Sequence, residues 1–397
     1  MKKHYIFLRR FSEWPVWGGC ENRVLDYFSE IDYKKTTITL LTNHDLFSHR
    51  FKEHKIPARV QLFPFDLRPS MGHFWEMLTL LRSCRPTHVV IIQGAFTDFS
   101  LADFAAAWIA SWGRLFALEV QGAPGPPQKC SKKYLGVFPG TGLWWYCYMI
   151  QMSLRGWLCK RILAVSDEVK QRMVDLYHYP ASRILSVFHG IDTGRFMSDP
   201  SLKKRLRSQF GFSNEDVLFI STARLSPEKQ IGRLIRAFDS VFFEQKNIVL
   251  LVLGTGLLEG DLKDLAKACP CAERIKFLGF QKDIADCLKM SDVFILPSDI
   301  EGLGIALLEA MATELVCIAT RTPGPNEILS DGDNGFLVER TEEGIRAGMI
   351  RALRLSHGER QAMTQRARTL INDRFQRDKR VAYALGILGI NTENATC

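Results

Sequence analysis

The chain of 397 residues lacks an apolar run long enough to cross a bilayer. Its most lipophilic segment, residues 143–154, has 12 residues, whereas a spanning helix needs about 20. The opening residues also lack the pattern of a secretory signal peptide, because Arg9 and Arg10 interrupt the short apolar run HYIFLRRF. These absences predict a globular, cytoplasmic protein with no transmembrane segment.

Cysteines and acidic motifs give little support for a disulfide framework or a metal site. Many of the ten cysteines lie in apolar stretches, for example Cys147, Cys159, Cys287 and Cys317, which is typical of small buried side chains in a reducing compartment. The Cys-Pro-Cys at residues 269–271 has no second cysteine or histidine pair at zinc spacing. No Asp-x-Asp motif stands at a strand end to hold Mg²⁺ or Mn²⁺. We expect no metal.

Length and hydrophobic patterning predict two α/β domains, because 397 residues exceed what one core usually supports. Short apolar runs alternate with helical patterns, which is typical of parallel sheets with crossover helices. The expected strands of the first half are HYIFLRR, TTITLLTN, RVQLFPF, THVVIIQG, LFALEVQG, RILAVSD and ILSVFHG. Those of the second half are VLFISTA, IVLLVLG, IKFLG, VFILPS, VCIATRT and GFLV. A break at HGIDTGRF predicts domains of residues 1–193 and 194–373.

The stretch EGLGIALLE, residues 301–309, follows the apolar run VFILPS directly. It puts Glu301 and Glu309 at the C-terminal end of a predicted parallel strand, where open α/β sheets bind ligands. Eight helical positions rise about 12 Å, so the two acids can hold separated parts of an elongated polar ligand such as a nucleotide sugar. Gly302 and Gly304 allow close approach of the backbone, and amides at a helix start favour a diphosphate.

This stretch resembles the Glu, seven residues, Glu signature of glycosyltransferase family 4, the retaining nucleotide-sugar transferases with the GT-B fold. Upstream, STARLSPEKQIGRLIRAF places Arg224 and Lys229 after a strand, and in the family the equivalent pair holds the donor diphosphate. LLVLGTG with Gly254, IKFLGF with Phe280, and MATELVCIATRTPGPNEILSDGDNGFLV continue the family's order of motifs. Several spaced motifs in order are a specific signal, whereas one Gly-x-Gly is weak.

The resemblance implies two Rossmann-like, doubly wound parallel-sheet domains facing across a cleft, with a last helix at about residues 374–397 packed back on the N-terminal domain. It implies a UDP- or GDP-sugar donor and no cofactor. The residues expected to be catalytic are Arg224, Lys229 and Glu301. Those expected to bind the donor are Gly18, Gly19, Arg224, Lys229, Gly254, Phe280, Glu301, Gly302, Leu303, Gly304 and Glu309.

The expected chemistry needs no metal ion. A leaving diphosphate can be stabilised by a metal or by fixed cations and amides, and Arg224, Lys229 and the turn at 302–304 are available for this. Glu309 is expected to accept hydrogen bonds from the ribose hydroxyls, and Glu301 to orient the donor sugar. By the resemblance, transfer retains anomeric configuration, and a donor phosphate oxygen helps to remove the acceptor proton.

The N-terminal motifs match the family less well. VWGGCENRVLDYF puts Gly18 and Gly19 where the family has a glycine loop beneath the diphosphate, although a plain strand-to-helix turn is the alternative. Many members carry a histidine after the strand that reads LFALEVQG, where this chain offers Glu119, Gln121 and Gly122. A second departure is Glu314, where a glycine is usual. Both departures concern the sugar and acceptor pockets rather than the diphosphate site.

Charge is divided unevenly along the chain. Residues 1–193 carry 24 Lys plus Arg against 16 Asp plus Glu, a net charge of +8, and residues 194–397 carry 28 against 27, a net charge of +1. Since the N-terminal half receives the acceptor in this family, the asymmetry favours an acidic acceptor or an anionic membrane surface. Cations and aromatics alternate over part of this half: Lys129, Lys132, Lys133, Tyr134, Phe138, Trp144, Trp145, Tyr148, Arg155, Lys160 and Arg161.

Such a mixed segment can dock at a bilayer interface, and packing of the aromatics in a core is the alternative. No nucleic-acid recognition motif is present. The sequence therefore predicts a cytoplasmic retaining glycosyltransferase, peripheral on the inner face of the membrane, which glycosylates an acidic or lipid-linked glycan acceptor in cell-surface polysaccharide or glycolipid synthesis. A non-catalytic nucleotide-sugar-binding protein stays open, as does another GT-B enzyme such as a sugar phosphorylase or an epimerase.

Overall fold

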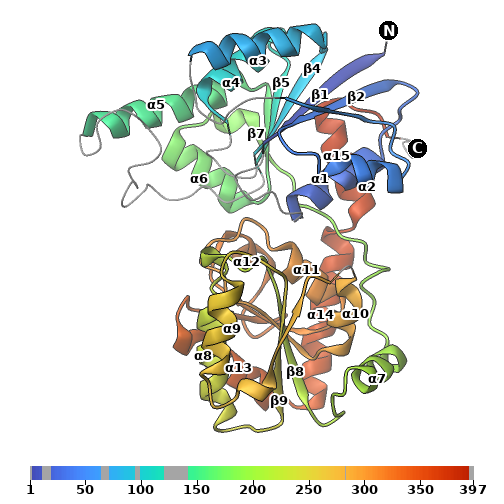
Figure 1. Ribbon diagram of the computed structural model, residues 1–397, viewed down its shortest axis with the longest axis vertical. Helices are drawn as coiled ribbons and strands as arrows, with labels where there is room; N and C mark the ends of the chain where they lie inside the picture. The colour runs from blue at the N-terminus through green and yellow to red at the C-terminus, as the bar shows by residue number, and fades with distance from the viewer. Residues whose placement is uncertain are drawn as a thin grey trace. The chain divides into compact units, whose positions relative to one another are not determined.

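The protein is described by a computed structural model for residues 2–10, 19–63, 71–93, 99–119, 142–281 and 283–392. The chain divides into two compact units (Figure 1). The N-terminal unit comprises Met1–His189 and Asp378–Cys397, and the C-terminal unit is Gly190–Arg377. The end of the chain thus belongs to the same unit as its beginning.

The N-terminal unit is built on a parallel sheet of seven strands in the order β3-β2-β1-β4-β5-β6-β7. Its strands are β1 (Lys3–Arg9), β2 (Thr36–Thr42), β3 (Arg59–Leu62), β4 (His88–Gln93), β5 (Leu115–Glu119), β6 (Arg161–Ala164) and β7 (Ile184–Ser186). Six lie within a stretch predicted as a strand, and β1 begins one residue before its predicted stretch. The order reverses between β1 and β4, as in a doubly wound sheet.

Two helical layers cover this sheet. Buried side chains such as Phe28, Phe51 and Leu385 form a core between the sheet and α1 (Gly19–Ser29), α2 (Phe47–Glu53) and α15 (Arg377–Leu388). The other face is covered by α3 (Met71–Ser83), α4 (Leu101–Ala110) and α5 (Gly142–Leu158), of which α4 contacts both neighbours (Figure 1). A further helix, α6 (Asp167–Tyr177), joins β6 to β7.

The C-terminal unit has a six-stranded parallel sheet in the order β10-β9-β8-β11-β12-β13. Its strands are β8 (Val217–Thr222), β9 (Ile248–Leu253), β10 (Ile275–Gly279), β11 (Val293–Leu296), β12 (Val316–Thr320) and β13 (Phe336–Val338). Its helices are α7 (Pro200–Gln209), α8 (Ile231–Phe242), α9 (Glu259–Lys267), α10 (Ile284–Met290), α11 (Ile305–Ala312), α12 (Pro323–Ile328), α13 (Glu342–Arg354) and α14 (His357–Arg374). The predicted fold class, parallel-sheet α/β units of Rossmann type, is confirmed.

The two ends of the C-terminal unit lie side by side. The backbone N–H of Ile191 donates to the carbonyl of Phe375 at 2.8 Å, and the N–H of Arg377 donates to the carbonyl of Ile191 at 3.1 Å. Gly190 fits here because a Cβ would lie 2.6 Å from the Arg377 Cα. Beyond this crossing, α15 joins the N-terminal unit, where the Tyr5 hydroxyl donates to the carbonyl of Gly389 at 2.9 Å.

No helix in the described ranges is both long and apolar enough to span a membrane. The side chains of Cys159, Cys287 and Cys317 are buried, as predicted. Burial in the apolar core raises the pKa of the Cys287 thiol to about 11, so this thiol is neutral at physiological pH.

The family departure at Glu314 coincides with strained backbone. Helix α11 ends in a Schellman motif, in which the N–H of Leu315 donates to the carbonyl of Ala310 at 3.1 Å and that of Glu314 donates to Met311 at 3.2 Å. Glu314 occupies the left-handed position of this motif with φ of 62°, where glycine is preferred. Its carboxylate accepts a hydrogen bond of 2.6 Å from the exposed Ser198 hydroxyl.

We expect Glu314→Gly to raise the free energy of unfolding by about 1 kcal/mol, because glycine removes the left-handed penalty of a side chain. Glu314→Ala is the matched control: it loses the bond to Ser198 and keeps the penalty, so it should show no gain. Urea denaturation of both variants measures the difference. A glycine variant no more stable than the alanine variant would contradict this account of the turn.

Candidate functional site

The strand order of the C-terminal sheet locates a candidate site at the carboxyl ends of β8 and β11. These neighbouring strands mark the point where the order reverses, and the chain leaves them toward opposite sides of the sheet. Two loops leave the sheet there, residues 223–230 after β8 and residues 297–304 after β11. The first carries the predicted residues Arg224 and Lys229, and the second carries Glu301.

An ion pair joins these two loops. The Lys229 ammonium donates to the Glu301 carboxylate at 2.6 Å, and both side chains are mostly buried, with 20% and 15% exposed. The hydroxyl of Ser298 lies 3.3 Å from the same carboxylate oxygen and donates to it. Two residues predicted from separate motifs therefore form one charged centre, although they are far apart in sequence.

Two further contacts tie the same loops together. The backbone N–H of Asp299 donates to the carbonyl of Glu228 at 2.9 Å. The Arg233 guanidinium, in the first turn of α8, contacts the Asp299 carboxylate at 2.7 Å. The loops are thus fixed at several points, so a ligand that bound here would meet a largely preorganised surface.

Arg224 lies on the same loop as Lys229 but has a different partner. Its guanidinium contacts the Glu228 carboxylate at 3.0 Å, and the Ser226 hydroxyl donates to the same oxygen at 2.6 Å. Burial acts to raise the pKa of Glu228, but the hydrogen bond from Ser226 and the charge of Arg224 outweigh it and hold the pKa below its ordinary value. Glu228 is therefore ionised at neutral pH and positions Arg224.

Sequence reasoning missed Glu228, Ser298 and Asp299. The signals that could have found them are the acid four residues after Arg224 and the polar side chains just after β11. Neither signal is specific by itself, since charged and small polar residues are common in surface loops.

A glycine is required at the predicted position 254, because another part of the backbone passes too close for a side chain. It follows β9 with φ of 118°, and a Cβ there would lie 1.9 Å from the carbonyl oxygen of Ala223. Gly256 has a similar constraint, because its Cβ would lie 2.5 Å from the carbonyl oxygen of Leu225. Close packing of the loops after β8 and β9 explains both glycines. Phe280, the next predicted residue, lies after β10 with its ring 61% exposed.

The segment from Glu301 to Glu309 differs from a continuous helix. Helix α11 begins only at Ile305, so Glu301 lies on the preceding turn and only Glu309, which is half-buried, lies on the helix. Gly304 adopts a left-handed conformation with φ of 84° at the N-cap, where no side chain caps the helix. The N–H groups of Leu307 and Leu308 donate to the carbonyl of Gly304 at 2.9 and 3.2 Å, whereas the amides at the very start of a helix lack intrahelical partners. Binding of an anion by these first amides stays a prediction.

Gly302 and Leu303 form the buried part of this turn. Gly324, at the start of α12, packs so closely that a Cβ would lie 2.3 Å from the Leu303 Cα. The N–H of Gly324 also donates to the carbonyl of Glu301 at 3.4 Å. The turn is therefore held from the α12 side as well as by Lys229.

The structure describes only some of the predicted residues of the N-terminal unit. Gly18 and residues 120–141 lie outside the described residues, and Gly19 is the first residue of α1. His88, at the start of β4, stacks on Tyr5 with ring centroids 4.4 Å apart. His189 lies 3.5 Å from the Asp26 carboxylate and is buried. Both histidines are thus packed within the N-terminal unit.

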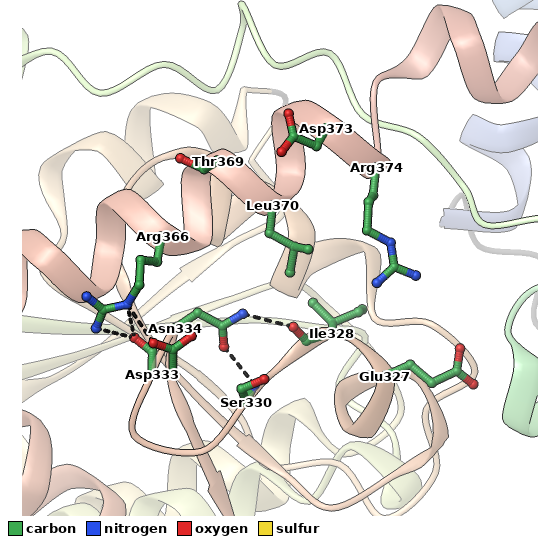
Figure 2. Close-up of a pocket in the computed structure, with 10 residues that line it drawn as sticks. All are labelled: Glu327, Ile328, Ser330, Asp333, Asn334, Arg366, Thr369, Leu370, Asp373 and Arg374. Atoms are coloured by element: carbon green, nitrogen blue, oxygen red, sulfur yellow. Dashed lines mark hydrogen bonds and ion pairs between the residues drawn. The ribbon is translucent and has the colours of Figure 1, made fainter.

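A separate hollow of about 360 Å³ lies on the C-terminal unit between the end of α12 and α14 (Figure 2). The Arg366 guanidinium contacts Asp333 at 2.7 Å, and the side-chain amide of Asn334 donates to the carbonyl of Ile328 at 3.1 Å. None of the predicted site residues lines this hollow. The charged side chains that line it are of both signs, Glu327, Asp333, Arg366, Asp373 and Arg374.

Comparison with known proteins agrees with this geometry. Residues 203–370 match the family of group 1 glycosyl transferases. They form a group 1 glycosyl transferase domain. This domain contains every predicted residue of the C-terminal site, so the resemblance to glycosyltransferase family 4 is confirmed for the part of the chain that carries its motifs.

Two relatives show how far the likeness extends. The chain is 30% identical over 204 residues to N-acetyl-alpha-D-glucosaminyl L-malate synthase of Bacillus anthracis, which covers 51% of this chain and 52% of that protein. It is 29% identical over 187 residues to the Escherichia coli UDP-Gal:alpha-D-GlcNAc-diphosphoundecaprenol alpha-1,3-galactosyltransferase, 45% of this chain and 47% of that protein. The chain thus matches about half the length of these relatives.

Solved structures extend the likeness to the whole fold. The structure of Anabaena HepE in complex with UDP and glucose aligns with a TM-score of 0.75 at 18% identity, over 97% of this chain and 99% of that one. The two parallel-sheet units are therefore the two domains of a GT-B fold.

We expect Gly254→Ala to lower the free energy of unfolding by about 3 kcal/mol, because the new Cβ overlaps the carbonyl of Ala223 and the backbone is left-handed. Gly260→Ala, in helix α9 with open space around it, is the control and should be neutral or stabilising by up to about 1 kcal/mol. Urea denaturation measures both. Equal stabilities would show that the two loops are not in contact at Gly254.

Proposed function

We propose that the protein is a retaining glycosyltransferase that uses a nucleotide-sugar donor. The observation that carries this proposal is the Lys229–Glu301 ion pair at the reversal of strand order, beside Arg224 and the uncapped start of α11. Fixed cations and helix amides at such a point suit a diphosphate. The group 1 domain and its relatives support the same reaction class.

In this proposal the cations act on the leaving group. Negative charge develops on the nucleoside diphosphate as the sugar leaves, and Arg224, Lys229 and the first amides of α11 stabilise it more strongly than they stabilise the ground state. The Glu301 carboxylate neutralises Lys229 while no diphosphate is present. A bound diphosphate shares Lys229 with Glu301, which frees lone pairs of Glu301 for the hydroxyls of the donor sugar.

Glu309 is assigned to the ribose, because a carboxylate can accept both hydroxyls of a vicinal diol. Proton removal from the acceptor is assigned to a donor phosphate oxygen, so the mechanism needs no separate protein base. We also propose that transfer proceeds without a metal ion or cofactor, since the cations above supply the charge. Undiminished activity in EDTA is the expected result, and loss of activity restored by Mg²⁺ or Mn²⁺ would overturn metal independence.

The acceptor and the place of action are proposed from charge. The net charge of +8 on residues 1–193 suits an acidic or lipid-linked glycan acceptor, met at the cytoplasmic face of a membrane during synthesis of a cell-surface polysaccharide or glycolipid. The Escherichia coli relative is named for a diphosphoundecaprenol-linked acceptor, which supports this class of acceptor.

Arg224→Ala and Lys229→Ala should each weaken nucleoside diphosphate binding by on the order of 2 kcal/mol or more, because a cation facing a partly buried anion is lost. A thermal-shift panel of UDP, GDP, ADP and TDP identifies the base, since a ligand at a hundred times its Kd adds about 2.7 kcal/mol of stability. Calorimetry with that diphosphate and its nucleoside then separates the effects: only diphosphate binding should fall. Unchanged diphosphate affinity in both variants would remove the assignment.

Glu301→Gln and Glu309→Gln should behave differently. Glu301→Gln should lower kcat and leave free nucleotide affinity equal or higher, because Lys229 is released from its carboxylate. Glu309→Gln should lower affinity for both free nucleotide and full donor by roughly tenfold, as for the loss of one charged hydrogen-bond acceptor. Calorimetry and a transfer assay measure both. Identical behaviour in the two assays would contradict this division of roles.

A further inference from the structure

The amino edge of the N-terminal sheet carries an unusual concentration of cations. Strands β1, β4, β5 and β6 are consecutive and parallel, so all four begin at this edge. The residues at the starts of these strands and just before them, 1–3, 84–87, 111–114 and 159–161, include six Lys and Arg and no Asp or Glu. We call these exposed side chains the basic rim: Lys2, Lys3, Arg85, Arg114, Lys160 and Arg161.

The basic rim is not neutralised by neighbouring acids. No ion pair involves its six members within the described ranges; Lys2 and Lys3 instead donate to backbone carbonyls. The flanking acids Asp32 and Asp175 are engaged, the first with Lys35 at 3.2 Å and the second with the Gln171 amide at 2.8 Å.

The cations at this edge affect the pKa of His88. Its ring lies between those of Tyr5 and Phe116, and its pKa is lowered to about 4, first by burial and then by the positive charges of Lys3, Arg114 and Lys160. His88 is therefore neutral at physiological pH. Three members of the rim, each at or just before the start of a different strand, thus lie close enough to act on one half-buried group.

Trp112 lies beside Arg114 at this edge. Helix α4 ends in a Schellman motif, in which the N–H of Gly113 donates to the carbonyl of Trp108 at 2.9 Å and that of Trp112 donates to Ile109 at 3.3 Å. Trp112 occupies the left-handed position, with φ of 53°, and its side chain is 87% exposed. A glycine would fit better, so neither backbone geometry nor packing explains this tryptophan.

A second set of exposed apolar side chains lies on α5. Ile150, Leu154 and Trp157 follow the spacing of one helical face and are all exposed, Trp157 by 57%. Arg183 lies over the Trp157 ring at 5.2 Å. Helix α5 contacts α4, so this face belongs to the same helical layer as Trp112, and its end leads into Lys160.

We propose that the basic rim, with Trp112 and the exposed face of α5, docks on the anionic surface of a lipid bilayer. Exposed tryptophans beside Lys and Arg match the chemistry of the interface, where indole rings sit at headgroup level and cations meet anionic lipids. The rim lies at the opposite edge of the sheet from the Gly19 end of the β1–α1 connection. The inference rests on the proposed function, because it assigns a docking surface to the proposed membrane location. The residues of this surface are distinct from Lys129, Lys132 and Lys133.

Sedimentation with vesicles containing about a third anionic lipid tests the surface, with neutral phosphatidylcholine vesicles as reference. The full chain should bind anionic vesicles at low salt and dissociate as salt rises, because the Debye length shortens. Arg114→Ser and Lys160→Ser should each lower the vesicle partition coefficient roughly fivefold. Trp112→Gly combined with Trp157→Ser should lower it about tenfold. Trp112→Gly alone should not lower the melting temperature, since glycine suits its backbone.

The matched control is Phe243→Ser with Lys246→Ser, an exposed aromatic and its adjacent cation on the C-terminal unit, which should bind vesicles as the wild type does. Thermal shifts induced by UDP, GDP, ADP and TDP should be equal in all variants. A wild type whose melting temperature responds to none of these four diphosphates would count against the proposed function alone. Three outcomes would each overturn this inference. The rim variants could bind vesicles as the wild type does, binding could be abolished only by replacing Lys129, Lys132 and Lys133, or the protein could bind DNA more tightly than vesicles.

Discussion

The reversal of strand order between β8 and β11 is the constraint on which the C-terminal unit depends. All six strands run in parallel, so every loop that follows a strand meets one edge of the sheet. Only where the order reverses do two adjacent loops diverge to opposite faces and leave space between them. The cations after β8 and the carboxylate after β11 face each other because the sheet offers no other point of this kind.

The site is held together mainly by backbone proximity and paired charges. Gly254 and Gly324 let loops approach to distances that any side chain would prevent, while the Lys229–Glu301 ion pair joins the loops in a mostly buried setting. Removing one member of such a pair leaves the other uncompensated, which costs more than the pair contributes. In the proposed function, a diphosphate would therefore meet a Lys229 side chain that the ion pair has already positioned.

The N-terminal unit uses its sheet edges differently. At the amino edge, the starts of four neighbouring strands bring together cations that are separated by up to about 160 residues in sequence. Burial, followed by the charges of three of these cations, lowers the pKa of His88. Trp112 adds an exposed indole at a left-handed position. Retaining cations and a strained tryptophan at one edge costs stability, which is the pattern expected of a surface kept for an interaction.

The sequence by itself determined the class of fold and pointed to Arg224, Lys229 and Glu301 as candidate site residues. Apolar runs of strand length predict the thirteen strands found in the described part of the chain, because burial on both faces of a parallel sheet demands continuous hydrophobic segments. The tertiary structure alone decided which residues meet. Strand order and loop packing decide the pairing of Lys229 with Glu301, the role of Glu228, the start of α11 at Ile305 and the basic rim. The physical reason is that local sequence patterns do not encode distances between segments far apart in the chain.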